Sequence, residues 1–177
     1  MPTGVLFVCL GNICRSPIAE GVFLHLARER NLVDQVRVES AGIGGWHVGE
    51  PPDRRAQAAS QRRGIQLLSR AKQVDAARYF DPARGGFDRL IAMDRANRDA
   101  LLRLGAPRDR LHLLRAFDPR LADAPDHLLD VPDPYYGGDE GFDEVFTMIR
   151  DACDGLLRDL FPEAAQQSSN FPRRARE

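Results

Sequence analysis

The sequence predicts an α/β fold, in which a parallel β-sheet has helices on both faces. Short apolar runs alternate along the chain with longer, helix-like stretches. Strands separated by helices are typical of βαβ units, which pair their strands in parallel. The chain has 177 residues, of which 43% are hydrophobic. This size favours a single domain with a core that needs no disulfides or metals.

The predicted elements follow one another in a regular order. We expect strands at four short apolar runs, 5–8, 36–42, 89–93 and 111–114. We expect a helix after each strand, at 17–31, 53–64, 94–105 and 140–161. The sequence therefore predicts one domain over 1–162 and a polar, disordered tail over 163–177. In such folds the functional site lies where the carboxyl ends of the strands run into loops.

The overall composition argues against several classes of partner. The chain has 25 Lys and Arg residues against 26 Asp and Glu, which gives a net charge of -1, and the basic residues are spread among acidic ones. Such dispersed charge argues against nucleic acid. The apolar run at 5–10 is too short for a signal peptide or a membrane span, so we expect a cytoplasmic location and no membrane partner. Three cysteines fit a reducing compartment.

The loop after the first strand is the first candidate site. Cys9 ends the strand, Ser16 is the predicted N-cap of the next helix, and Pro17 suits its first position. Gly11 permits a positive φ and Asn12 tolerates one, so the loop can curl until its N–H groups converge on an anion. The predicted phosphate loop consists of Leu10, Gly11, Asn12, Ile13, Cys14, Arg15 and Ser16.

Cys9 and Arg15 give this loop a catalytic character. The helix dipole, the convergent N–H groups and Arg15 all favour the thiolate form of Cys9, which is a nucleophile. The planar guanidinium of Arg15 can hold two phosphoryl oxygens and stabilise the charge that develops during phosphoryl transfer. A buried cysteine beside a surface arginine is the structural alternative. A Walker A loop is excluded because no Gly-Lys-Ser/Thr is present, and ligand spacing for zinc is missing. The chemistry requires no metal or organic cofactor.

Several segments resemble those of the low-molecular-weight protein tyrosine phosphatases. They are CLGNICRSPIAE at 9–20, SAGIGGWHVGEPPDRRA at 40–56, MDRAN at 93–97 and DPYYGG at 133–138, in the order expected for that family. The resemblance extends to about residue 161 and does not cover the tail. It implies a four-stranded parallel sheet flanked by helices. It also implies a cysteine-dependent phosphatase that hydrolyses phosphotyrosine through a phosphocysteine on Cys9.

The reaction also needs a general acid for the leaving oxygen. Five aspartates lie in one loop-like region: Asp118, Asp123, Asp126, Asp130 and Asp133. Asp133 is preferred because Pro132 and Pro134 keep its backbone extended, while the glycines at 137–138 let the segment bend over a pocket. A plain turn aspartate is the alternative on the residues alone. The resemblance points to Asp133 as well.

Aromatic residues on two loops could flank an aryl substrate. Trp46 follows the second strand, and Tyr135 and Tyr136 follow the predicted acid, so together with Ile13 they predict a pocket for phosphotyrosine. Trp46 could instead be a packing residue. The resemblance also implies supporting roles. It suggests that Asn12, Ser16 and Ser40 brace the phosphate loop and that Asp94 supports the site.

The second cysteine of the loop suggests redox protection. Because the curled loop brings Cys14 near Cys9, an oxidised Cys9 could form a reversible disulfide with Cys14. The alternative is that Cys14 only packs. Cys153 falls in the last amphipathic helix and is predicted to be core.

Three other functions compete with a tyrosine phosphatase. Some arsenate reductases share this fold and loop but need further cysteines in the middle of the chain, and none occurs between Cys14 and Cys153. Protein arginine phosphatases carry threonine at the position of Ile13. A non-catalytic module that binds phosphoproteins should lack Cys9 or Asp133. The resemblance also suggests partners. Bacterial relatives often act against tyrosine autokinases, so phosphotyrosine-containing proteins, with such a kinase among them, are the expected partners.

Overall fold

A sheet of four strands forms the centre of the computed structural model, which describes residues 1–163. The strands are β1 (Thr3–Cys9), β2 (Val36–Gly42), β3 (Arg89–Ala92) and β4 (Leu111–Leu113). Their order is β2-β1-β3-β4, and each neighbouring pair is parallel. This arrangement confirms the predicted fold class. It also places the carboxyl ends of β1 and β3 side by side, with Val8 paired to Ala92.

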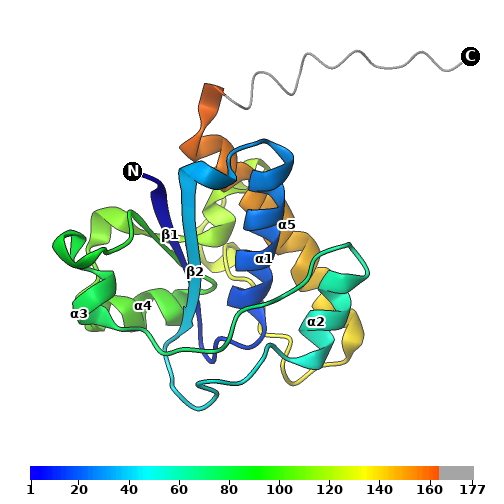
Figure 1. Cartoon of the computed structure of the whole chain (residues 1–177). Coiled ribbons are helices and arrows are strands. Elements are labelled where there is room, and N and C mark those ends of the chain that lie inside the picture. Colours follow the sequence, from blue (N-terminus) through cyan, green and yellow to red (C-terminus); the bar gives the residue numbers. More distant parts are fainter. Residues whose placement is uncertain (164–177) are drawn as a thin grey trace, which may run out of the picture.

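Helices cover both faces of this sheet. They are α1 (Arg15–Glu29), α2 (Arg54–Gln61), α3 (Ala76–Tyr79), α4 (Arg95–Arg103) and α5 (Asp139–Leu160). In Figure 1, α1, α2 and α5 lie to one side of the sheet, and α3 and α4 lie to the other. Single-turn 3-10 helices occupy parts of the connecting segments. The short helix α3 was not predicted.

Strand β1 explains why two helical layers are needed. Val5, Phe7 and Cys9 face the core beneath α1 and α5, whereas Leu6 and Val8 face the core beneath α4. Residues 5–8 are fully buried because side chains of a strand alternate between the two faces, and both faces are covered. The uninterrupted apolar run is therefore the sequence signature of a central parallel strand.

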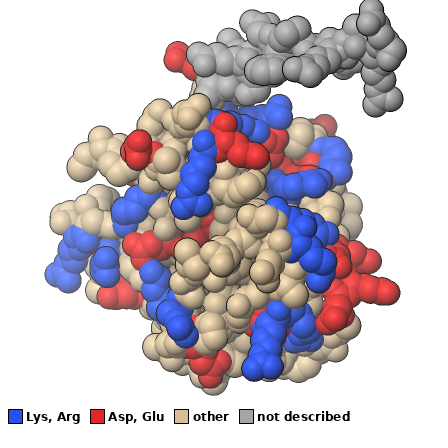
Figure 2. Space-filling model, turned by 45° about the vertical axis from the view of Figure 1, so that its right-hand side comes forward, with Lys and Arg blue, Asp and Glu red and all other residues tan. Residues whose placement is uncertain are grey.

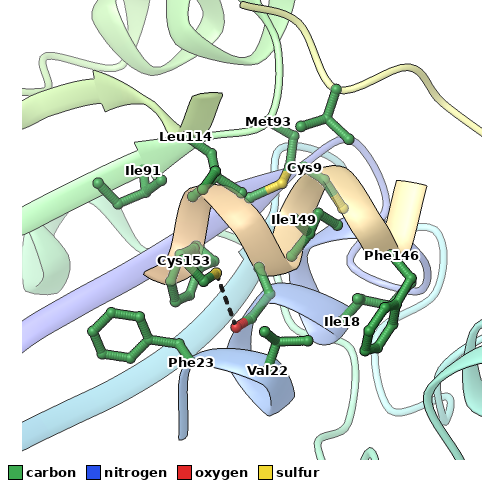
Figure 3. Packing of buried hydrophobic residues seen from close by; sticks show 14 of the residues in the cluster. Cys9, Ile18, Val22, Phe23, Ile91, Met93, Leu114, Phe146, Ile149 and Cys153 are labelled. Atoms are coloured by element: carbon green, nitrogen blue, oxygen red, sulfur yellow. Dashed lines mark hydrogen bonds between the residues drawn. The ribbon is translucent and has the colours of Figure 1, made fainter. Parts of the chain in front are cut away.

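The larger core lies between the sheet and the pair α1 and α5 (Figure 3). The buried Cys153 of α5 points toward α1, where its thiol donates a hydrogen bond to the carbonyl of Ala19 at 3.8 Å. Burial raises the pKa of Cys153 above its usual value, as expected for a packing residue. Gly155 lets the segment 114–117 approach α5, because a Cβ at this position would lie only 1.8 Å from the carbonyl oxygen of Phe117.

The surface carries both signs of charge. Figure 2 shows basic and acidic side chains interspersed among uncharged ones on the face in view. Within residues 1–163, no helix is long and apolar enough to cross a membrane. The prediction of a disordered tail concerns mainly residues 164–177, which lie outside the described residues.

Candidate active site

The predicted nucleophile lies at the carboxyl end of β1, beneath the phosphate loop. Cys9 is the last residue of β1, and its side chain is buried. The backbone N–H of Asn12 donates to its Sγ at 3.3 Å, and Oγ of Ser16 lies 3.0 Å from the same sulfur. Donors directed at sulfur stabilise negative charge on it. The loop therefore surrounds Cys9 with groups suited to a thiolate.

The phosphate loop obtains its curl from Asn12 rather than from Gly11. Asn12 has a φ of 58°, in the left-handed region, whereas Gly11 does not have a positive φ, so this part of the prediction is wrong. A Cβ at Gly11 would lie 3.1 Å from Cδ2 of His47, a tight contact that a small shift of the His47 ring would relieve. Gly42 at the end of β2 has the stronger need for space, since its Cβ would lie 3.0 Å from the backbone carbonyl carbon of Gly11.

Helix α1 begins earlier than the sequence predicts. Its first residue is Arg15 and its N-cap is Cys14, which makes no side-chain capping bond. The prediction of Ser16 as N-cap and Pro17 as first residue is therefore wrong, and Pro17 stands at the third position. Proline is tolerated there because the first four N–H groups of a helix have no intrahelical acceptor. The Ser16 hydroxyl is thus free to turn toward Cys9 and Asn12.

The Asn12 side chain holds the loop in place with three hydrogen bonds. Its Nδ2 donates to Oγ of Ser16 at 2.8 Å and to Oγ of Ser40 at 2.9 Å. Its Oδ1 accepts the backbone N–H of Lys72 at 2.9 Å. The Ser40 hydroxyl donates in turn to Glu20, whose pKa is raised by burial. All three residues implied as loop supports, Asn12, Ser16 and Ser40, therefore belong to one network.

Arg15 is oriented from the opposite side of the loop. Its side chain is buried, and Nη1 donates to Oδ2 of Asp94 at 2.6 Å and to the carbonyl of Val131 at 2.9 Å. Burial opposes the charged form, but the nearby Cys9 and Asp94 outweigh it and raise the pKa of Arg15. Nη2 remains directed toward Asp133, at 3.6 Å from its Oδ2. The guanidinium is thus fixed at one end and faces the site at the other.

Asp94 supports two elements at once. It follows β3 and is the N-cap of α4, where its Oδ1 accepts the backbone N–H of Asn97 at 2.7 Å. Its Oδ2 binds Arg15. One carboxylate therefore connects the start of α4 to Arg15, the predicted phosphate-binding residue.

The predicted acid lies on a loop that docks against the end of β3. We call residues 130–138 the acid loop; its Val131 N–H donates to the carbonyl of Met93 at 2.8 Å. The side chain of Asp133 is 36% exposed, and its Oδ1 accepts the N–H of Tyr135 at 3.2 Å. Asp133 is the only one of the five candidate aspartates that lines the pocket above Cys9. Three of the others pair with arginines: Asp118 with Arg120, Asp126 with Arg98, and Asp130 with Arg95.

A pocket of about 340 Å³ opens above Cys9. Its floor is the phosphate loop, and its walls include Trp46, His47, Asp133, Tyr135 and Tyr136. Trp46 is 70% exposed and Tyr136 is 93% exposed, so their rings stand at the rim rather than in the core. The rings of Tyr135 and Tyr136 contact each other edge to face, with centroids 5.0 Å apart. An aromatic phosphate ester can therefore lie between two aromatic walls.

Comparisons with known proteins assign the family. Residues 4–167 match the family model of the low molecular weight phosphotyrosine protein phosphatases. The chain belongs to this family. It is 45% identical to low molecular weight protein-tyrosine phosphatase A of Mycobacterium tuberculosis over 155 residues, which cover 88% of this chain and 90% of that protein. Both the predicted family and its enzyme class, cysteine-dependent phosphatase, are confirmed.

Solved structures of similar fold agree with this assignment. The crystal structure of YfkJ from Bacillus subtilis has a TM-score of 0.77 and 37% identity, with 97% of this chain and 98% of that chain covered. A structure described as an arginine phosphatase of Drosophila also has a TM-score of 0.77, at 32% identity, with 90% of this chain and 98% of that chain covered. Relatives described by two different substrates therefore share this phosphatase fold.

Two residues of the phosphatase site were not predicted. His47 lines the pocket, and its Nδ1 lies 2.8 Å from Oε2 of Glu50. Its position beside Trp46 in the same loop was the one available signal. Arg55 contacts the acid loop from α2. Nothing in its local sequence distinguishes it from the other arginines of the chain.

The remaining cysteine of the loop, Cys14, also lines the pocket. Cys14 is buried and forms no disulfide. Burial, together with the nearby Asp53, raises the pKa of its thiol. Cys14 therefore favours the thiol form at neutral pH. Within residues 1–163, no group of three or more His, Cys, Asp or Glu side chains is arranged to hold a metal ion.

Proposed function

We propose that this protein hydrolyses phosphotyrosine monoesters through a phosphocysteine intermediate on Cys9, with Arg15 binding phosphate and Asp133 as general acid and base. The observation that carries the proposal is the convergence of these three side chains on one pocket. Nη2 of Arg15 lies 3.6 Å from Oδ2 of Asp133, and Cys9 lies on the pocket floor between the loops that carry them. The nucleophile, the phosphate-binding arginine and the acid of this proposal thus line the same pocket.

The first step transfers the phosphoryl group to sulfur. The Cys9 thiolate attacks phosphorus, the bond from phosphorus to the phenolic oxygen breaks, and Asp133 gives its proton to that oxygen. The N–H groups of the phosphate loop and the guanidinium of Arg15 bind the equatorial oxygens, on which negative charge is spread in the transition state.

The second step releases phosphate. A water molecule attacks phosphorus, Asp133, now a carboxylate, accepts its proton, and the bond from phosphorus to sulfur breaks to regenerate the thiolate. The same carboxyl group therefore serves as acid in one step and base in the next. A half-exposed side chain at the pocket wall suits this role, because it can reach both the leaving oxygen and water.

The pocket walls favour an aromatic substrate. Trp46, Tyr135 and Tyr136 offer ring faces and edges to a phenyl group, and the apolar Ile13 also lines the pocket. We therefore propose phosphotyrosine proteins as the partners. The tyrosine autokinase and the cytoplasmic location predicted from the sequence belong to the same proposal. Arginine phosphatase activity is the second candidate, because the Drosophila structure, at 32% identity, is described by that activity. Arsenate reduction is disfavoured, since Cys9, Cys14 and Cys153 are the only cysteines.

The neighbouring Cys14 supports a protective disulfide. Peroxide would oxidise the Cys9 thiolate to the sulfenic acid, and the Cys14 thiol would then displace water to form the Cys9–Cys14 disulfide. Mass spectrometry of peroxide-treated protein should find this bridge. Detection of sulfinic or sulfonic Cys9 without any bridge would contradict it.

The direct test of the function is hydrolysis of p-nitrophenyl phosphate in mildly acidic buffer without added metal. We expect activity that Cys9→Ser and vanadate abolish. Asp133→Ala should reduce kcat by about 100-fold or more, because Asp133 also accepts the proton of water in the second step. Asp123→Ala is the matched control, because Asp123 lies in the same region but outside the pocket. Phosphotyrosine and phosphoarginine peptides then decide the substrate class. An inert wild type that still binds phosphopeptides would identify a binding module instead.

A further inference from the structure

Arg55 occupies a place in the molecule that the phosphatase chemistry does not by itself require. It lies in the first turn of α2, and its side chain reaches across to the acid loop. Nη2 donates to the carbonyl of Tyr135 and Nη1 donates to the carbonyl of Gly137, each at 3.1 Å. Its guanidinium carbon also lies 4.6 Å from the ring centroid of Phe142, at the start of α5. Arg55 therefore binds both ends of the turn that follows the predicted acid.

Asp53 holds the guanidinium in this orientation. Its Oδ1 accepts Nε of Arg55 at 3.0 Å, and its Oδ2 accepts Nη2 at 2.9 Å, which is a bidentate pair. This pair lowers the pKa of Asp53, so the carboxylate stays charged at neutral pH. The backbone N–H of Asp53 donates to the carbonyl of Ile13 at 2.8 Å. The Asp53–Arg55 pair is thus attached to the phosphate loop on one side and to the acid loop on the other.

The link continues to the acid itself through one residue. The carbonyl of Tyr135 accepts from Arg55, and the N–H of Tyr135 donates to Oδ1 of Asp133 at 3.2 Å. The other carboxylate oxygen of Asp133 faces Arg15. A shift of the backbone at Tyr135 therefore moves the carboxyl group relative to the phosphate site, and general acid catalysis is sensitive to such a shift.

We propose that Arg55 is a positioning residue that fixes the distance between the general acid Asp133 and the phosphate loop. This inference rests on the proposed function, since it assigns Arg55 an effect on one step of that reaction. Arg55 does not line the pocket, so its action passes through the acid loop rather than through substrate. Loss of the Arg55 side chain should therefore slow protonation of the leaving oxygen by Asp133 and leave the affinity for phosphate unchanged.

The dependence of rate on the leaving group separates this role from a general loss of structure. We would measure kcat/KM, which covers steps through the first phosphoryl transfer, for aryl phosphates whose phenols range from p-nitrophenol to phenol. Phenol resembles tyrosine, whose pKa is about 10, and its oxygen needs the proton most. We expect Arg55→Met to lower kcat/KM by about 10-fold for phenyl phosphate and by less than about 2-fold for p-nitrophenyl phosphate.

The variants are chosen to keep the fold. Methionine keeps an unbranched, helix-compatible side chain but removes the guanidinium that lies over Phe142. Arg55→Lys preserves the charge but cannot reproduce the fork, so it should give a smaller effect of the same kind. Arg54→Met is the matched control, because Arg54 is exposed and its side chain makes no hydrogen bond among the described residues. In an Asp133→Asn background, Arg55→Met should have no further effect on the leaving-group dependence.

Two results would overturn the inference. If Arg55→Met and Arg55→Lys lower kcat/KM equally for every leaving group, or leave it unchanged, Arg55 does not act on the acid. If Arg55→Met changes the leaving-group dependence as much in the Asp133→Asn background as in the wild type, Arg55 acts on a group other than Asp133. Failure of the proposed function is distinguishable, since in that case the wild type itself hydrolyses none of these esters.

Discussion

The phosphate loop and the acid loop face each other across one pocket, but they are held in different ways. The phosphate loop is buried from Asn12 to Ser16, and the Asn12 network fixes it from within, beside the core between β1 and α1. The acid loop is largely exposed and is held by backbone contacts to β3 and by the side chain of Arg55. The phosphate loop, which is predicted to bind substrate, thus packs against the core, whereas the acid loop, which carries the predicted proton donor, lies on the surface. Substitutions should separate the two.

Removal of the Asn12 side chain should have the largest effect. Asn12→Ala removes one hydrogen-bond partner from each of the Ser16 and Ser40 hydroxyls and leaves the N–H of Lys72 without its acceptor, and it places alanine at a positive φ. We expect a loss of about 3 kcal/mol in unfolding free energy and of about 100-fold in kcat/KM. Urea denaturation and steady-state kinetics measure the two.

A second asparagine provides the control for Asn12. Asn31 also has a positive φ, at 57°, but it is exposed and lies far along the chain from the site. Asn31→Ala should therefore cost only the backbone strain of about 1–2 kcal/mol and leave kcat/KM unchanged. Equal losses in both variants would mean that the network contributes nothing.

Asp94→Asn should weaken the phosphate site while sparing its helix. Asparagine is as good an N-cap as aspartate, so α4 keeps its cap, but the buried Arg15 loses its charged partner. We expect kcat/KM to fall by about 10- to 100-fold, and the thermal midpoint to fall by a few degrees because Arg15 stays buried with less compensating charge. Asp75→Asn, at the N-cap of α3, is the control and should leave activity intact. An unchanged kcat/KM in Asp94→Asn would show that Arg15 needs no fixed orientation.

These contrasts also explain how much the sequence could predict. The phosphate loop was predictable because its functional residues are adjacent in the chain, between a recognisable strand and a helix. Asp133 could be favoured because its flanking prolines and glycines are local signals. The exact start of α1 was missed because Ser16 directs its hydroxyl at Cys9 rather than at the helix backbone.

Long-range contacts set the limit of that prediction. Arg55 reaches Gly137 across 82 positions, and Lys72 reaches Asn12 across 60. Neither residue carries a local pattern that indicates its partner. Asp94, which is 79 positions from Arg15, was found only through resemblance to known phosphatases. Such long-range contacts depend on which strands lie next to each other in the sheet. The strand order β2-β1-β3-β4 determines this, and it is known only from the structure.

The rim aromatic residues should affect binding and not stability. Trp46 is 70% exposed, so Trp46→Ala should change the unfolding free energy by no more than about 0.5 kcal/mol. Loss of its ring from the pocket wall should raise KM for phenyl phosphate several-fold, with a smaller effect on kcat. Leu68→Ala, at an 81% exposed side chain away from the pocket, is the control. A large loss of stability in Trp46→Ala would assign Trp46 to packing instead.

The Asp53–Arg55 pair should show its contribution in the pH dependence of stability. The hydrogen bonds from Arg55 lower the pKa of Asp53 below its usual value of 3.8, so its stabilising charge is present above that value and is lost as the pH falls through the lower, folded-state value. Asp53→Asn should therefore cost about 1 kcal/mol at neutral pH, and the difference from wild type should shrink below about pH 4. Urea denaturation over this range tests it. Asp34→Asn, at an exposed site, is the control for the same substitution away from the Arg55 contact.

The covalent intermediate tests the central claim most directly. Enzyme mixed with p-nitrophenyl phosphate and quenched in acid within milliseconds should carry one phosphoryl group, and peptide mass spectrometry should place it on Cys9 and not on Cys14 or Cys153. In Cys9→Ser, no phosphoryl group should form on the enzyme and be hydrolysed at the wild-type rate. A wild-type enzyme that hydrolyses the ester with no phosphoryl group on Cys9, or with one on another residue, would contradict the account.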